Sequence, residues 1–91
     1  MTVEVRIPTI LRPYTSGEKL VTVEGTSLAE VINNLESTYP GLGDRLTDEN
    51  GLRRFINVYI NDEDVRFLSG LQSVISANDS ITILPAVAGG M

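Results

Sequence analysis

The chain has 91 residues, 42% of them apolar, which is the length and composition of one small domain with a single buried core. It lacks cysteine and histidine, so disulfides, thiolate metal ligands and the commonest general base are excluded. Its formal charge of −5 disfavours nucleic acid and anionic membranes as partners.

The first segment predicts a half-buried strand, because Val3, Val5 and Ile7 alternate with polar residues. Prolines follow this segment and interrupt strand pairing, since proline lacks the backbone donor. A second strand is predicted from Lys19 to Val23, with its alternate valines on one face. The two strands are expected to form a hairpin with a long loop.

A helix is predicted next. Ser27, followed three residues later by Glu30, fits a capping box, and Thr26 is the alternative cap. Apolar residues then follow at helical spacing, so that one stripe of the helix faces the core. These residues are Leu28, Val31, Ile32, Leu35 and Tyr39. Pro40 and Gly41 end the helix.

The second half of the chain predicts a polar loop and three further strands. The loop runs from Gly43 to Arg53, with one turn around Leu46. Strands are predicted at Phe55–Ile60, at Val65–Phe67 as a short return strand, and at Ser80–Leu84. The residues expected to reach the core from this half are Ile56, Val58, Ile60, Leu71, Val74, Ile75, Ile81 and Ile83.

This order of elements predicts an α+β fold, because one amphipathic helix covers only one face of a mixed sheet. The first and last strands both have buried patterns, so they are expected to be parallel neighbours in the middle of the sheet. That arrangement is the β-grasp, or ubiquitin-like, fold. We expect it to span residues 1–85, with residues 86–91 as a flexible C-terminal tail.

The tail is the segment that suggests chemistry. Gly89 and Gly90 have no Cβ, so an extended chain can pass through a narrow channel and a reagent can approach the carbonyl. A carboxylate must first be activated, usually as an acyl-adenylate. The chain has no phosphate-cradling loop, so activation is expected from a partner that holds ATP. We therefore predict no catalytic residue in the folded body, no metal and no cofactor.

A docking patch is predicted on the strand before the acidic turn. Phe55 and Tyr59 lie opposite to its inward face, near the outward Leu84, and Val87 of the tail extends the patch. Exposed apolar clusters on small domains tend to be interfaces. Two alternatives are that these residues are ordinary surface apolars or that the Gly43–Arg53 loop covers them.

The acidic run Asp62–Asp64 has the oxygen ligands that a hard cation prefers. Such a run is more often a solvated turn, which is the interpretation adopted for it.

Three segments carry a family resemblance: Ile7–Pro13, Asn57–Phe67 and Asp79–Gly90. Together they make the chain similar to the ubiquitin-like sulfur-carrier proteins, the group of the small molybdopterin synthase subunit and the thiamine sulfur carrier. The first two segments resemble the CysO type, which supplies sulfur for cysteine synthesis. The resemblance covers essentially the whole chain and implies a carrier, not an enzyme.

The resemblance also implies partners. A ubiquitin-activating-type enzyme adenylates the carboxylate of Gly90, which then becomes a thiocarboxylate. A sulfur-accepting synthase follows, which is a PLP-dependent cysteine synthase in the CysO case. The chain departs from the family pattern at Met91, which follows Gly90. Some similar carriers have extra C-terminal residues that a JAMM-type metallopeptidase removes, so Met91 is expected to be a processing site.

Two other functions compete with the carrier. The first is a protein modifier joined through Gly90 to a lysine on a target, and the second is an interaction module with an inert tail. The N-terminal segment lacks the apolar block of a secretion signal, and no apolar run approaches the ~20 residues of a membrane span, so a cytoplasmic protein is expected.

Overall fold

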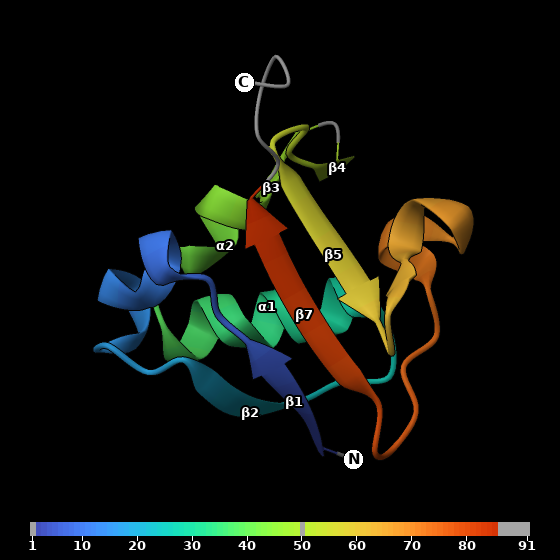
Figure 1. Cartoon of the computed structure of the whole chain (residues 1–91), viewed down its shortest axis with the longest axis horizontal. Coiled ribbons are helices and arrows are strands. Elements are labelled where there is room, and N and C mark those ends of the chain that lie inside the picture. The colour runs from blue at the N-terminus through green and yellow to red at the C-terminus, as the bar shows by residue number, and fades with distance from the viewer. Residues whose placement is uncertain (1, 50, 86–91) are drawn as a thin grey trace.

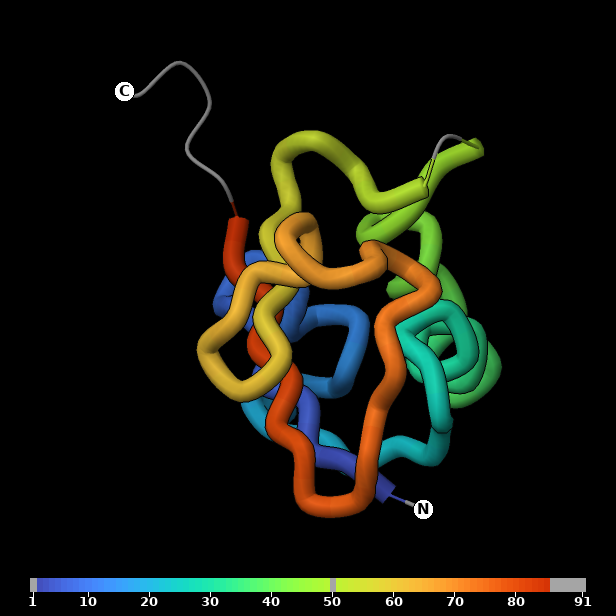
Figure 2. Tube along the Cα trace, turned by 90° about the vertical axis from the view of Figure 1, so that its right-hand side faces the viewer, coloured from blue at the N-terminus to red at the C-terminus, as the bar shows by residue number. Residues whose placement is uncertain are grey.

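A five-stranded mixed sheet forms one layer of the fold, and a helix packed on one face of the sheet forms the other (Figures 1 and 2). The computed structural model describes residues 2–49 and 51–85. The strands of the sheet are β1 (Thr2–Arg6), β2 (Leu20–Glu24), β5 (Ile56–Ile60), β6 (Glu63–Asp64) and β7 (Ser80–Pro85). The covering helix is α1 (Leu28–Thr38).

The sheet has the order β2-β1-β7-β5-β6, with the first and last long strands at its centre. β1 pairs antiparallel with β2 and parallel with β7, and β7 pairs antiparallel with β5. Val5 therefore lies between Val21 and Ile81 in the central ladder. The predicted β-grasp arrangement is confirmed, including the hairpin at the N-terminus and the parallel central pair.

The residues before α1 form the capping box that the sequence predicts. Ser27 is the cap, and its Oγ accepts a hydrogen bond from the amide of Glu30 at 3.2 Å. The Glu30 carboxylate reaches back to the Thr26 amide at 2.6 Å. Both threonine and serine therefore take part, but Ser27 occupies the cap position.

The core lies between α1 and the sheet. All four apolar residues of the stripe Leu28, Val31, Ile32 and Leu35 are buried, as predicted, whereas Tyr39 at the helix end is only half-buried. The sheet residues predicted to face the helix are also buried; these are Val3, Val5, Ile7, Val21, Val23, Ile56, Val58, Ile60, Ile81 and Ile83. Packing of these two layers is what fixes the position of β7.

The segment predicted as an irregular loop is in fact ordered. It contains the helix α2 (Leu42–Leu46) and a small hairpin of β3 (Thr47–Asp48) and β4 (Gly51–Leu52). Leu42 and Leu46, four residues apart, are both fully buried against the core. The predicted turn around Leu46 is therefore confirmed as part of α2, whereas the prediction of an otherwise irregular loop is wrong, because α2 begins before Gly43 and the β3–β4 hairpin follows it.

The return strand was predicted at the wrong residues. It is the two-residue β6, and Val65–Phe67 forms a 3-10 helix, η2. Asp64 causes the change, since its carboxylate caps η2 by accepting from the Arg66 amide at 2.9 Å. A second 3-10 helix, η3 (Gly70–Gln72), follows.

Two more differences concern single elements. The residues between the first two strands form η1 (Thr9–Thr15), a 3-10 helix whose Leu11 enters the core. Ile75 is buried and Leu71 packs against the core, but Val74 is 76% exposed. Its backbone instead bridges to Ser27 at the start of α1, which turns the side chain outward. Among the described residues, no helix is long and apolar enough to cross a membrane.

Candidate functional site

The central strand β7 determines where the C-terminal segment leaves the fold. Its last residue, Pro85, lies opposite Ile56 of β5, at the top of the sheet in Figure 1. The predicted reactive residues Gly89 and Gly90, the processing residue Met91 and the docking residue Val87 all lie outside the described residues. The structure therefore describes the surface around the end of β7, which any enzyme acting on the tail must approach.

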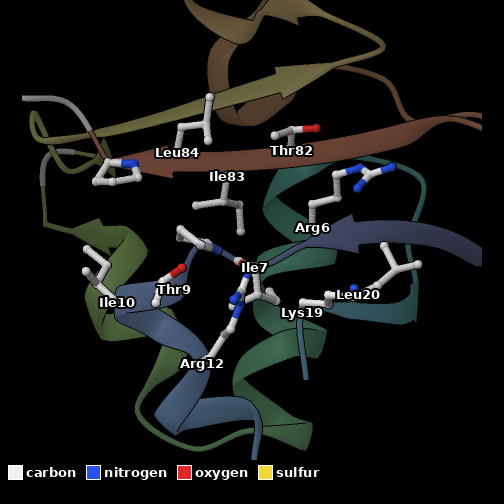
Figure 3. Close-up of a pocket in the computed structure, with 12 residues that line it drawn as sticks. Arg6, Ile7, Thr9, Ile10, Arg12, Lys19, Leu20, Thr82, Ile83 and Leu84 are labelled. Carbon is white, nitrogen blue, oxygen red and sulfur yellow. The ribbon is translucent and has the colours of Figure 1, made fainter. Parts of the chain in front are cut away.

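One groove beside Pro85 opens on the exposed side of the sheet and is here named the Leu84 groove. Leu84, Leu20 and Ile10 supply its apolar lining. Arg6, Arg12 and Lys19 line it as well. Figure 3 shows Arg12 extending from η1 toward Ile7, whose carbonyl accepts a hydrogen bond from its Nε at 3.2 Å. The groove is thus lined by both apolar and basic side chains.

A second groove also reaches Pro85 and is here named the Phe55 groove. Phe55, Ile10 and Tyr14 line it together with Pro85. Arg45 stacks over the Tyr14 ring at 5.5 Å from the centroid and donates from Nε to the Tyr14 hydroxyl at 2.7 Å. Ile10 and Pro85 belong to both grooves, so the two form one continuous surface around the end of β7.

The structure brings two of the predicted docking residues to this surface. Phe55 is 54% exposed and Leu84 is 45% exposed, so the Gly43–Arg53 segment leaves Phe55 largely uncovered. Tyr59 also faces outward, but it is half-buried, pairs with Thr82 and Asp64 and lines neither groove. Phe55 and Leu84 therefore belong to the surface around Pro85, and Tyr59 lies further along β5.

Sequence reasoning missed two apolar residues of the same surface. Ile10 is 61% exposed, and Leu20 is exposed on the outward face of β2. Ile10 lies between Pro8 and Pro13, and this bracketing was the available signal for a short rigid turn that presents a side chain. The periods of strands and α-helices do not reveal Ile10, because the 3-10 helix η1 has neither of them.

The glycines of the turn after α1 do not form a phosphate site. The amides of Gly41 and Gly43 donate to the carboxylate of Glu36, at 3.0 and 2.7 Å for the closest contacts. These are the donors that a phosphate would need at the start of α2. The geometry agrees with the prediction that the helix ends before Gly41, and the backbone amides of the turn that follows are already bound by the carboxylate of Glu36.

The acidic turn at Asp62–Asp64 has a structural role. Asn61 and Asp62 both have positive φ, of 51° and 74°, and connect β5 to β6. Asp64 caps η2 and lies 3.9 Å from the Arg66 guanidinium. No group of three or more potential metal ligands occurs among the residues that the structure describes.

The β-grasp fold, with a central C-terminal strand that leads into Gly89-Gly90, defines the ubiquitin-like class of small proteins. A model of the ThiS family matches residues 5–90, and the chain belongs to this family.

Individual relatives agree with this family. The chain is 55% identical to the sulfur carrier protein CysO of Mycobacterium tuberculosis, over 99% of this chain and 100% of that protein. The crystal structure of the Amycolatopsis orientalis BexX/CysO complex includes a similar chain with 55% identity and a TM-score of 0.91, covering 97% of this chain and 99% of that one. Small archaeal modifier protein 3 of Haloferax volcanii is 30% identical over 74% of this chain and 73% of its own length.

Proposed function

We propose that the chain carries sulfur as a thiocarboxylate at Gly90, made by a ubiquitin-activating-type enzyme. Sulfur carriage itself rests on one observation, the 55% identity to sulfur carrier protein CysO across the whole length of both chains. It confirms the prediction of a carrier that is not itself an enzyme. The route to the thiocarboxylate, and the residues that take part in it, are the proposed part.

The proposed chemistry has two steps. The Gly90 carboxylate attacks the α-phosphorus of ATP, which forms an acyl-adenylate and releases pyrophosphate. A sulfide equivalent then attacks the acyl carbon, which forms the C–S bond and releases AMP. The thiocarboxylate is a good nucleophile at neutral pH, because a thioacid ionises far below a thiol.

The folded body contributes position to this chemistry. β7 lies between β1 and β5; its ladder with β1 ends at Thr82, whereas its pairing with β5 continues to the last residue, Pro85, which lies opposite Ile56. Gly90 follows five residues later, so the enzyme that receives it works close to the Leu84 and Phe55 grooves. We assign docking to Phe55 and Leu84 of the two grooves and to Tyr59 further along β5, and Val87 of the C-terminal segment is proposed to extend this patch.

Met91 is proposed to be removed before activation. With Met91 present, the Gly90 carbonyl belongs to an amide, which does not attack ATP. Met91 also carries a Cβ and a long side chain, which a channel shaped for glycine excludes. A JAMM-type metallopeptidase is the proposed processing enzyme.

The proposed sulfur acceptor is a PLP-dependent cysteine synthase, so that the sulfur enters cysteine biosynthesis. The 55% identity to sulfur carrier protein CysO supports the sulfur-carrying part of this assignment, and the acceptor is the proposed part. The Amycolatopsis orientalis CysO chain crystallised in complex with BexX, which supports binding of this type of carrier to a separate partner protein.

The experiment compares the chain as written with a chain that ends at Gly90. Each is incubated with the activating enzyme, ATP and a sulfide source, and intact mass spectrometry records replacement of one oxygen by sulfur. We expect conversion of the shorter chain alone. Conversion of the longer chain with Met91 still attached would contradict the proposed route.

A second candidate function is protein modification. It is favoured by the 30% identity to small archaeal modifier protein 3 and by a TM-score of 0.82, at 31% identity, to small archaeal modifier protein 1 of Methanosarcina acetivorans. Lys19 is the single lysine of the chain, which leaves little scope for chains built on itself. A ladder of lysine conjugates after activation, without thiocarboxylate, would favour the modifier over the carrier.

A further inference from the structure

All seven lysine and arginine residues gather around the end of β7, although the chain has 12 acidic residues. The six that line the Leu84 and Phe55 grooves are Arg6, Arg12, Lys19, Arg45, Arg53 and Arg54. The seventh, Arg66, donates to the side chain of Asn57, which lies directly opposite Leu84. We call these seven residues the basic face. They are spread from position 6 to position 66 of the sequence, so the fold alone brings them together.

Neutral groups hold three of these arginines in place. Arg12, Arg45 and Arg53 each donate from Nε to an uncharged oxygen. The acceptors are the Ile7 carbonyl at 3.2 Å, the Tyr14 hydroxyl at 2.7 Å and the Asp44 carbonyl at 2.6 Å. Such bonds orient a guanidinium without neutralising its charge. Among the described residues, no acidic side chain lines the Leu84 groove, and Asp48 is the one acidic residue that lines the Phe55 groove. Outside the grooves, the Asp64 carboxylate lies 3.9 Å from the Arg66 guanidinium.

The exposed side of the sheet is polarised along its strands. Arg6 lies beside Thr82, toward the end of β7. Glu4 lies beside Ser80, at the start of β7, and Glu24 of β2 lies opposite the first residue of β1. The two ends of the same face therefore carry opposite charge. A positive potential is expected at the end of β7 even though the whole chain is negative.

We propose that the basic face binds an acidic protein surface at the mouth of the site of the adenylating enzyme that receives Gly90. This inference rests on the proposed function and adds the chemistry of the partner surface. Five residues separate Pro85 from Gly90, and at ~3.3–3.6 Å per residue they span at most about 18 Å. An enzyme that encloses Gly90 must therefore contact the surface around Pro85.

The centre of the basic face favours a protein as its partner. Ile10 is exposed and lines both grooves, and the exposed Leu84 and Phe55 line one groove each, together with its cations. Interfaces between proteins typically have an apolar centre with charged groups at the rim, and rim charges mainly raise the association rate. The phosphates of a nucleic acid would contact the cations and leave the side chains of Ile10 and Leu84 without a partner.

The test uses the chain ending at Gly90 and the purified adenylating enzyme. The variant Arg6→Gln/Lys19→Gln removes two positive charges from the Leu84 groove. The control Gln72→Glu/Ala77→Glu lowers the net charge by the same amount at exposed positions that line neither groove. Two readouts are taken at low and at high ionic strength: kcat/KM for ATP–pyrophosphate exchange, and the association rate of the fluorescently labelled chain with the enzyme.

At low ionic strength we expect the groove variant to lose about tenfold in both kcat/KM and the association rate. High salt should remove most of this loss, because it screens the charges. The control should change by less than about twofold in both readouts. Equal values for variant and control, or a loss that salt does not reduce, overturn the proposal. If association depends on the groove charges and on salt but no pyrophosphate exchange occurs, this inference is supported and the proposed function is overturned. An unmutated chain that does not bind the enzyme overturns both. Tighter binding of single-stranded DNA than of the enzyme at the same ionic strength also overturns the proposal.

Discussion

Replacing Leu46 by alanine tests whether α2 is part of the core. Leu46 is 0% exposed and lines the same internal space as residues of both layers, among them Leu28 of α1, Val58 of β5 and Ile83 of β7. It lies in the segment whose polar sequence predicts a loop. If α2 were only a surface turn, its loss would leave the domain nearly as stable as before.

The magnitude follows from what the substitution removes. Leu→Ala deletes three carbons, and at about 0.8 kcal/mol for each buried carbon this lowers the free energy of unfolding by about 2.4 kcal/mol. The cavity that remains adds to this cost, because a packed core relaxes only partly, and the total is expected at about 3–4 kcal/mol. A domain of this size has about 5–14 kcal/mol in all, so the melting temperature should fall by more than about 10 °C.

Urea unfolding followed by far-ultraviolet circular dichroism measures this change. The matched control is Leu20→Ala, the same substitution at a residue that is 40% exposed; at the same rate per buried carbon it should lower the free energy of unfolding by about 1.4 kcal/mol or less. Two outcomes would refute the reasoning: a loss below about 1 kcal/mol for Leu46→Ala, or equal losses for the two variants. Either result would place Leu46 outside the packed core.

Three further predictions concern single side chains. Gly25→Ala should destabilise the fold by about 1–3 kcal/mol, because a Cβ there would lie 2.6 Å from Val31 Cγ2 and 3.0 Å from Val31 N; an unchanged urea midpoint would show that α1 shifts to make room. Ser27→Ala should cost about 1 kcal/mol in the same assay, since it removes the side-chain acceptor of the Glu30 amide, and Ser27→Asp should restore most of it. Phe55→Ala should leave the free energy of unfolding unchanged and weaken docking to the adenylating enzyme by about 1–3 kcal/mol, measured by pyrophosphate exchange. Full exchange activity of this variant would show that the Phe55 groove is not the docking surface.

The sequence by itself determined the long strands, the long helix and the hydrophobic core between them. The alternation in β1, β5 and β7 and the capped apolar stripe of α1 are local patterns that show which side chains are buried. The structure has each of these elements where it was predicted. Two central strands with buried faces were enough to predict the parallel pair. The carrier function followed from motifs along the chain, which need no tertiary structure to be recognised.

Only the tertiary structure decided the short elements. One helical turn is unstable alone, because nucleation costs more than a few hydrogen bonds return. α2 exists because Leu42 and Leu46 close the core and Glu36 binds the amides at its start. η2 likewise replaces a predicted strand because a single carboxylate, that of Asp64, caps it.

The surface around the end of β7 was also a product of the fold. Ile10 and Leu84 come from opposite ends of the chain, and they lie on one surface because β1 and β7 are parallel neighbours. Phe55 joins them through the pairing of β5 with β7. The same pairings gather basic residues that have no pattern along the sequence. Local periodicity reports which side of an element is buried, whereas the neighbours on its exposed side depend on strand order, which only the assembled sheet determines.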